Sequence, residues 1–295
     1  MDYLEKYGYA PDHEKIGHAL ELIAANLENL ASEQVYKECF SMMDLTTLKT
    51  DDTPASVALL AGKVNAFKEV YPQWPLPASV CVYSNFAATV AAERKCDFNI
   101  TVVSACFPSS QSFLEVKLKE CEMAVEQGAD EVDIVLALNK FLSGDYEGAA
   151  EEIRQVRTCI DEVARKQGRT VHLKVILETG LLKSPESIAK ASFLAMEAGA
   201  DFIKTSTGKV DVNATPMAAY VMCECIAKYH EATGKKIGFK PAGGISSAPD
   251  ALCYYSIVCA VLGREWLNKE LFRFGVSRVA NSLLAAVEQK TVSYF

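Results

Sequence analysis

The stretch GADFIKTSTGK, from Gly199 to Lys209, joins a short apolar run that ends on a lysine to a hydroxyl-rich turn that ends on another. Its first half predicts a buried strand that follows a glycine break and closes at Lys204. In α/β proteins, ligands bind at this carboxyl end of the strands. Because an unpaired buried ammonium costs several kcal/mol, the position favours a functional lysine. A salt-bridged structural lysine is the alternative.

On both sides of this stretch, strand-like runs alternate with helical runs. This alternation is typical of a parallel sheet built from βα units. The run 113–127 has apolar residues on one face of a helix. The run 184–198 begins with Ser184 and Pro185, which are common at helix starts. The predicted strands cover residues 39–43, 79–83, 98–104, 131–137, 171–177, 201–204, 236–240 and 271–275. Eight such units predict an α/β fold, a (β/α)8 TIM barrel.

The length of 295 residues suggests two domains, but one barrel commonly occupies about 200 to 250 residues. Because no low-complexity segment or long linker interrupts the pattern, we expect a single barrel domain over residues 1–295. A helix at 13–30, with apolar residues at i, i+4 and i+7, predicts an N-terminal helical extension over 1–35. Residues 288–295 form the expected C-terminal tail.

The net charge of −8 argues against nucleic acid or an anionic membrane as the main partner. The ten cysteines are scattered except for Cys223 and Cys225, which indicates reduced thiols in a reducing compartment. The first residues do not resemble a signal peptide, and no run approaches the roughly 20 apolar residues of a membrane span. We therefore expect a soluble cytoplasmic protein.

A second stretch, GADEVD from Gly128 to Asp133, repeats the pattern of GADFIK. The shared offset from glycine gives Asp133 and Lys204 the same place in their units. If these are strands four and six of a barrel, both side chains point inward in one layer, because alternate strands fill a layer. The repeat therefore predicts an acid and a lysine that face one cavity.

The segment GFKPAGGI places Lys240 at the end of the next predicted strand. Two cations about 4 Å apart, at an effective dielectric constant of about 20, repel by about 4 kcal/mol, or roughly 3 pKa units. Such repulsion carries a lysine pKa from about 10.4 toward neutrality, and a neutral amine attacks carbonyl carbons. In the alternative, each lysine pairs with a carboxylate such as Asp133 or Glu178.

The loops after the seventh and eighth predicted strands indicate a phosphate site. Gly243 and Gly244 leave backbone N–H groups open ahead of a helix start, which favours anions. Ser277 occupies the matching loop of the next unit, and Lys209, just past Gly208, adds a positive charge. Barrel enzymes often bind phosphate in these two loops, whereas plain turns are the alternative.

Other chemistries lack their motifs. A P-loop would need glycine at Ile203 and Ser or Thr at Val210. The four histidines form no zinc-binding pattern, and Cys223 and Cys225 have no partners in sequence. Neither a G-x-S-x-G elbow nor a G-x-G-x-x-G fingerprint occurs, which argues against a serine hydrolase and a Rossmann dehydrogenase. The sequence predicts no metal and no cofactor.

Together these motifs resemble the deoxyribose-phosphate aldolase family, class I enzymes of the TIM-barrel type that form a Schiff base. The matching segments follow the family's order and cover nearly the whole barrel. They are MDLTTL (43–48), ADEVDIV (129–135), LKVILETG (173–180), DFIKTSTGK (201–209), VNAT (212–215), GFKPAGGI (238–245) and FRFG (272–275). The two lysine motifs together are highly specific.

The resemblance implies that Lys204 forms the imine, that Lys240 lowers its pKa, and that Asp133 transfers protons with a water. It also implies substrate and phosphate contacts from Asp44, Thr207, Gly208, Lys209, Gly243, Gly244 and Ser277. The implied reaction is reversible cleavage of 2-deoxy-D-ribose 5-phosphate to D-glyceraldehyde 3-phosphate and acetaldehyde, without metal or organic cofactor. The expected partners are these small substrates and further copies of the chain in a homo-oligomer, with a dimer favoured.

Three features depart from the family's pattern. Arg278 follows Ser277 in place of a second small hydroxyl residue, and either adds charge to the phosphate site or faces solvent. Tyr294, the candidate proton relay, is followed by Phe295, and the loop 105–110 lacks the family's Gly or Asn. The alternatives are therefore a catalytically weakened aldolase-like barrel that acts as a binding or scaffold protein, and a transaldolase-like or keto-acid aldolase with another donor.

Overall fold

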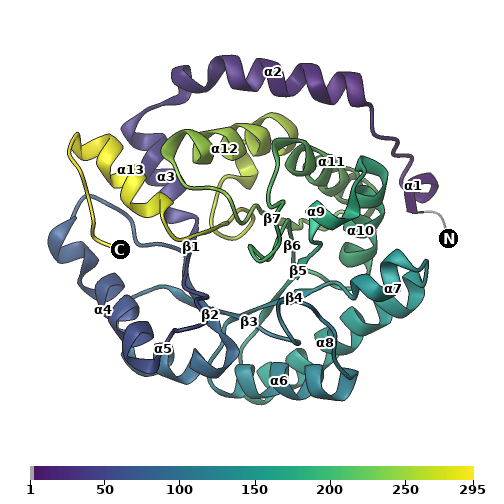
Figure 1. Cartoon of the computed structure of the whole chain (residues 1–295), viewed down its shortest axis with the longest axis horizontal. Coiled ribbons are helices and arrows are strands. Elements are labelled where there is room, and N and C mark those ends of the chain that lie inside the picture. The colour runs from purple at the N-terminus through teal and green to yellow at the C-terminus, as the bar shows by residue number, and fades with distance from the viewer. Residues whose placement is uncertain (1–2) are drawn as a thin grey trace.

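The computed structural model describes residues 3–295, and its centre is a sheet of eight parallel strands surrounded by helices (Figure 1). The strands are β1 (Met43–Thr46), β2 (Ser79–Tyr83), β3 (Asn99–Val103), β4 (Glu131–Val135), β5 (His172–Ile176), β6 (Phe202–Lys204), β7 (Gly238–Lys240) and β8 (Phe274–Val276). From β1 to β7 each strand pairs with the next in sequence, and β1 also pairs with β8.

The two ends of this order, β7 and β8, meet through isolated bridges. Phe239 lies opposite Phe272, and Ala242 lies opposite Gly275. The backbone N–H of Arg273 donates to the Phe239 carbonyl oxygen at 3.0 Å. The sheet thereby closes into a barrel, and the predicted (β/α)8 fold is confirmed.

The helices lie outside the strands. They are α1 (Tyr3–Lys6), α2 (His13–Leu30), α3 (Glu33–Ser41), α4 (Pro54–Val70), α5 (Ala87–Glu93), α6 (Leu114–Glu126), α7 (Leu138–Leu142), α8 (Tyr146–Lys166), α9 (Thr179–Leu182), α10 (Pro185–Glu197), α11 (Pro216–Thr233), α12 (Ala248–Leu262) and α13 (Val279–Glu288), with short 3₁₀ turns at Ser84–Phe86 and Arg264–Trp266. Helix α2 has the predicted bounds and packs across α11 and α12. Within residues 3–295, no helix is both long enough and apolar enough to cross a bilayer.

The first predicted strand, 39–43, is wrong. Residues 39–41 complete helix α3, and β1 begins only at Met43. Cys39 and Phe40 are buried because α3 packs against α12 and α13, so their apolar character marks the inner face of a helix. A run this short does not distinguish a buried helix end from a strand.

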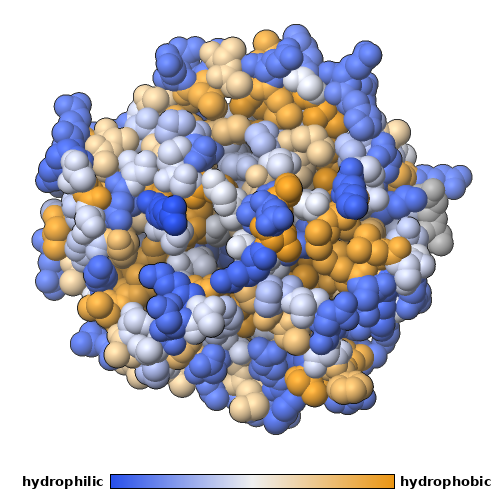
Figure 2. All heavy atoms as spheres, viewed as in Figure 1, coloured by the Kyte–Doolittle hydropathy of each residue, from blue (hydrophilic) through white to orange (hydrophobic). Residues whose placement is uncertain are grey.

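The eighth predicted strand, 271–275, begins too early. The carbonyl of Leu271 and the N–H of Arg273 hydrogen-bond to Phe239 in β7. The ladder with β1 starts only where Phe274 lies opposite Met43. The other six predicted strands are confirmed, each with ends within two residues of the observed ones. The face seen in Figure 2, which shares the view of Figure 1, is hollowed near its centre, over the barrel.

Strand register inside the barrel places the predicted site residues side by side. Asp133 in β4 lies opposite Lys174 in β5, and Lys204 in β6 lies opposite Lys240 in β7. Two residues earlier, Phe202 lies opposite Gly238 at the start of β7. The buried ring of Phe202 occupies the space that a side chain at Gly238 would need.

Gly238→Ala tests this packing. A Cβ at Gly238 would lie 2.3 Å from ring carbons of Phe202, so the substitution should lower the free energy of unfolding. The expected loss is about 1–3 kcal/mol, typical of an overpacked core, and urea unfolding followed by circular dichroism measures it. Gly62→Ala in α4 is the matched control, because its added Cβ meets no atom within 4 Å and alanine favours helix. Equal stability of Gly238→Ala and the parent protein would contradict the predicted clash.

Candidate active site

Seven charged side chains fill the interior of the barrel, each at most 3 % exposed. We call them the barrel charge cluster, and they are Asp44, Glu131, Asp133, Lys174, Lys204, Lys240 and Arg273. Three carboxylates therefore face four cations. Since an uncompensated buried charge is costly, the cluster favours loss of one proton from one of its cations.

Asp133 is the acid that the lysines share. Its Oδ2 accepts hydrogen bonds from the Nζ atoms of Lys204 and Lys240, both at 2.8 Å. Its Oδ1 accepts one from the Nζ of Lys174 at 3.1 Å. The predicted proximity of Asp133 and Lys204 inside the barrel is confirmed, although Asp133 does not itself line the pocket that Lys204 reaches. A single carboxylate contacts lysines from three successive strands.

The other cations of the cluster each contact at least two carboxylates. Lys240 pairs with Asp44 as well as Asp133. Lys174 pairs with Glu131 and Asp133 and lies 3.7 Å from Asp44. The guanidinium of Arg273 bridges Asp44 at 2.6 Å and Glu131 at 2.7 Å.

Lys204 differs from these three cations. Among residues 3–295 its one carboxylate partner is Asp133, which it shares with two other lysines. It is therefore the cation that the cluster compensates least.

The pKa shifts follow this difference in pairing. Burial lowers the pKa of Lys204, and repulsion by Lys240 lowers it further against the attraction of Asp133. Burial also opposes the charge of Lys240, but Asp133 and Asp44 outweigh it and raise the pKa of that lysine. Asp133, Glu131 and Asp44 likewise hold the pKa of Lys174 above its ordinary value against burial.

Both interpretations of the lysine pair are partly right. The sequence predicts that repulsion by Lys240 lowers the pKa of Lys204, and the structure shows burial as the larger cause. The lysines also pair with Asp133, as the salt-bridged alternative expects. Glu178 instead accepts hydrogen bonds from the N–H and hydroxyl of Thr207, at 3.1 and 2.6 Å.

The side chain of Lys204 reaches a pocket of about 250 Å³ at the carboxyl ends of β6, β7 and β8. Six residues predicted from the sequence line this lysine pocket: Lys204, Thr207, Gly208, Lys209, Gly243 and Ser277. Asp133 and Lys240 lie in the buried cluster that contacts the lysine. The loop after β1 also contributes to the wall, and its Leu48 carbonyl accepts a hydrogen bond from the Lys209 amine at 2.5 Å.

Gly243 lines this pocket, whereas Gly244, the next residue of the same turn, does not. The two glycines have φ of 77° and 78°, a left-handed conformation that costs glycine little. A Cβ on Gly243 would lie 2.6 Å from the Asn213 side chain, so this position also lacks room for one. The N–H groups of Ser246 and Ser247 are bonded to Asp250, each at 2.9 Å. The N–H groups of these two serines are therefore not free to bind an anion.

Two predicted residues lie away from the lysine pocket. Asp44 is fully buried, and it accepts a hydrogen bond from Ser79 at 2.8 Å while pairing with Lys240 and Arg273. It balances the charges of these two cations inside the barrel and does not line the pocket. The hydroxyl of Tyr294 donates to the Lys63 carbonyl at 2.8 Å, so it is directed toward α4.

Sequence reasoning missed Glu131, Lys174 and Arg273 as members of the cluster. Each lies within or next to an apolar strand, at an alternate position that points into the barrel. A charged residue at an inward-facing strand position is the feature of the sequence that could have identified them. Its partners depend on strand register, which the sequence alone does not give.

The closed βα barrel holds a buried lysine, Lys204, whose pKa is lowered and whose side chain lines a pocket. These features are typical of enzymes in which a lysine amine attacks a carbonyl carbon. The family model "DeoC/LacD family aldolase" matches residues 39–252. Deoxyribose-phosphate aldolases of Homo sapiens and Agrobacterium fabrum are 41% and 38% identical, across 85% and 83% of this chain and 78% and 88% of theirs. The chain therefore belongs to the DeoC/LacD family of aldolases and is a carbon–carbon lyase.

Solved structures agree with the fold. The tetrameric deoxyribose phosphate aldolase of Aeropyrum pernix superposes with a TM-score of 0.68 at 22% identity. The match covers 95% of this chain and 100% of that one. The resemblance found in the sequence is confirmed at the level of family and fold.

Glu131→Gln tests the charge cluster. Although burial opposes ionisation, Lys174 and Arg273 lower the pKa of Glu131 to about 2 from an ordinary value of 4.5. Removing one member of a buried ion pair costs about 3–5 kcal/mol, so the variant should be less stable by this amount at pH 7. The ionised carboxylate stabilises the fold above pH 4.5, and this contribution is lost as the pH falls toward 2.

The stability difference between Glu131→Gln and the parent protein should therefore narrow over that acid range. Urea unfolding at several pH values measures it. Glu126→Gln, at an exposed position at the end of α6, is the control and should change little. A variant as stable as the parent at pH 7 would show that the cluster does not depend on Glu131.

Proposed function

We propose that this aldolase reversibly cleaves 2-deoxy-D-ribose 5-phosphate to D-glyceraldehyde 3-phosphate and acetaldehyde through a Schiff base on Lys204. The observation that supports the proposal most is that Lys204 differs from the other buried cations in its pairing and its access to a pocket. It is the least compensated cation of the barrel charge cluster, and its side chain lines the lysine pocket. The named deoxyribose-phosphate aldolases at about 40% identity support the choice of substrate.

In the proposed reaction, the neutral amine of Lys204 attacks C1 of the open-chain sugar and water leaves. The resulting protonated imine draws electrons from the C2–C3 bond as the C3 hydroxyl loses its proton. This step releases D-glyceraldehyde 3-phosphate and leaves an enamine. Protonation at C2 restores an imine, and water then releases acetaldehyde and regenerates the amine.

Asp133 and Lys240 divide the supporting tasks in this proposal. Asp133 contacts the Lys204 nitrogen directly and is placed to exchange protons through a water in the pocket. Lys240 stays protonated, because its pKa is raised, and its charge favours the neutral form of Lys204. The iminium ion itself is the electron sink, so the proposal needs neither a metal nor an organic cofactor.

The substrate's phosphate is proposed to lie at the mouth of the lysine pocket. Gly208 and Gly243 offer backbone there, Ser277 a hydroxyl, and Lys209 a cation. Gly244, the next residue after Gly243, is proposed to contact the phosphate from beside the pocket. Thr207 contributes to the wall near the sugar hydroxyls. The amine of Lys209 exchanges its present bond to the Leu48 carbonyl for the phosphate.

Three further expectations accompany this function as proposals. The single barrel domain with its N-terminal helices works as a homo-oligomer, with a dimer favoured. Its location is the cytoplasm. Tyr294 serves as a proton relay only if its hydroxyl leaves the Lys63 carbonyl.

Covalent trapping tests the nucleophile. Incubation with acetaldehyde and cyanoborohydride should give an ethyl adduct on Lys204, which peptide mass spectrometry locates. Lys209→Met should retain this adduct but raise the KM for deoxyribose 5-phosphate about tenfold or more, because a charge-assisted bond to the phosphate is lost. If the folded protein gives no adduct on Lys204, the aldolase mechanism fails and a binding or scaffold role is favoured instead.

The pH dependence of trapping tests the role of Lys240. Its charge lowers the pKa of Lys204, so Lys240→Leu should move the onset of adduct formation to higher pH. Lys235→Leu, at an exposed position ahead of β7, is the control and should leave the profile unchanged. An unaltered profile in Lys240→Leu, with the fold intact by circular dichroism, would refute the electrostatic role.

A further inference from the structure

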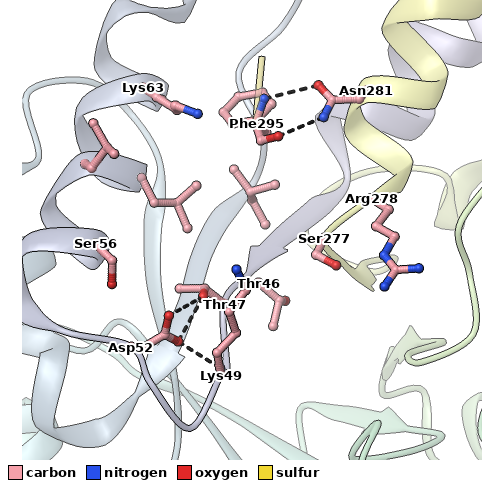
Figure 3. Close-up of a pocket in the computed structure, with 13 residues that line it drawn as sticks. Thr46, Thr47, Lys49, Asp52, Ser56, Lys63, Ser277, Arg278, Asn281 and Phe295 are labelled. Carbon is pink, nitrogen blue, oxygen red and sulfur yellow. Dashed lines mark hydrogen bonds between the residues drawn. The ribbon is translucent and has the colours of Figure 1, made fainter. Parts of the chain in front are cut away.

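A second cavity, of about 650 Å³, lies between α4 and the start of α13 (Figure 3). It adjoins the lysine pocket, because Thr46, Thr47, Lys49 and Ser277 line both. In Figure 3, Ser56 and Lys63 project from α4 on one side, and Arg278 and Asn281 lie on the other. The cavity is larger than the lysine pocket and is not needed for the proposed reaction.

Positive charge dominates the wall of this second cavity. Lys49, Lys63 and Arg278 line it, and none of them has an ion-pair partner among residues 3–295. Its single carboxylate, Asp52, is engaged by the Thr47 hydroxyl at 2.8 Å and by the Lys49 backbone N–H at 2.9 Å. Among the side chains of the wall, three cations against one carboxylate leave an excess of two positive charges, in a chain whose net charge is −8.

Apolar side chains complete the wall. They are Leu45, Leu59, Leu60 and Phe295. Leu59 is 64% exposed, so a large aliphatic surface faces the space. An apolar part of a ligand would be more stable against this wall than in water.

Arg278 lines the second cavity and not the lysine pocket, whereas the preceding Ser277 lines both. Its side chain is exposed and forms part of the cationic wall of the second cavity.

We propose that this cavity binds an organic phosphate monoester with an apolar or aromatic portion, at a site separate from that of the substrate's phosphate. A phosphate monoester carries about −1.5 to −2 charges at neutral pH, which matches the positive excess of the wall. Lys63 and Arg278 hold the phosphate from opposite sides by charge-assisted bonds. The carbon portion packs on Leu59 and Leu60. This site does not require that Lys204 form an imine.

Calorimetric titration with phenyl phosphate tests the site in the full-length protein. Lys63→Gln and Arg278→Gln should each weaken binding about tenfold, because each removes a charge-assisted contact. Lys68→Gln, an exposed lysine on the same helix, should leave the affinity unchanged. Lys209→Gln should also retain binding, because Lys209 lines only the lysine pocket. Acetaldehyde trapping at Lys204 in the Lys63→Gln variant reports separately on the proposed reaction.

Two results would overturn the second site. One is phenyl phosphate binding that Lys209→Gln abolishes and Lys63→Gln retains, since the ligand would then occupy only the substrate's phosphate site. The other is an absence of binding, or an equal loss in Lys68→Gln, which would indicate only general charge attraction.

A comparison of probes tests the apolar wall. The parent protein should bind phenyl phosphate several-fold more tightly than inorganic phosphate, and Leu59→Ser should reduce this preference. Equal affinity of the parent protein for the two probes would contradict the proposed apolar portion of the ligand.

Discussion

The carboxylate of Asp133 contacts three lysine amines inside a closed barrel, and the chemistry of the site depends on this shared contact. Lys174, Lys204 and Lys240 come from three successive strands, so one acid connects β4 with β5, β6 and β7. Four buried cations without Asp133 would face only two carboxylates. Such an excess in a low-dielectric interior is strongly unfavourable, which makes Asp133 a structural requirement as well as a catalytic candidate.

The same cluster distinguishes one lysine from its neighbours. Lys240 contacts two carboxylates and Lys174 contacts three, and this pairing raises their pKa above the ordinary value. Lys204 has one shared acid and a side of its amine that faces the pocket. Under the proposed function, this unequal distribution of counter-charges makes Lys204 the reactive amine. Burial and the charge of Lys240 lower its pKa.

Much of this arrangement follows from the sequence, because strand alternation and the Gly-Ala-Asp repeat place Asp133 and Lys204 in one layer. The sequence does not reveal which carboxylates pair with which cations, since that depends on register between strands and on the closure near Arg273. The end of α3 resembles a strand in sequence because Cys39 and Phe40 are buried on a helix. The place of the Arg278 side chain likewise depends on how α13 packs on α3 and α12.

The central claim is that Lys204 is the first of the buried amines to lose its proton. An NMR titration of the protein with ¹⁵N-labelled lysine side chains, assigned by single lysine substitutions, measures this order directly. Lys204 should pass from ammonium to amine at a lower pH than Lys174 and Lys240, which should remain ammonium ions throughout that transition. Deprotonation of Lys240 before Lys204, or of both together at the pH of an ordinary exposed lysine, would contradict the account.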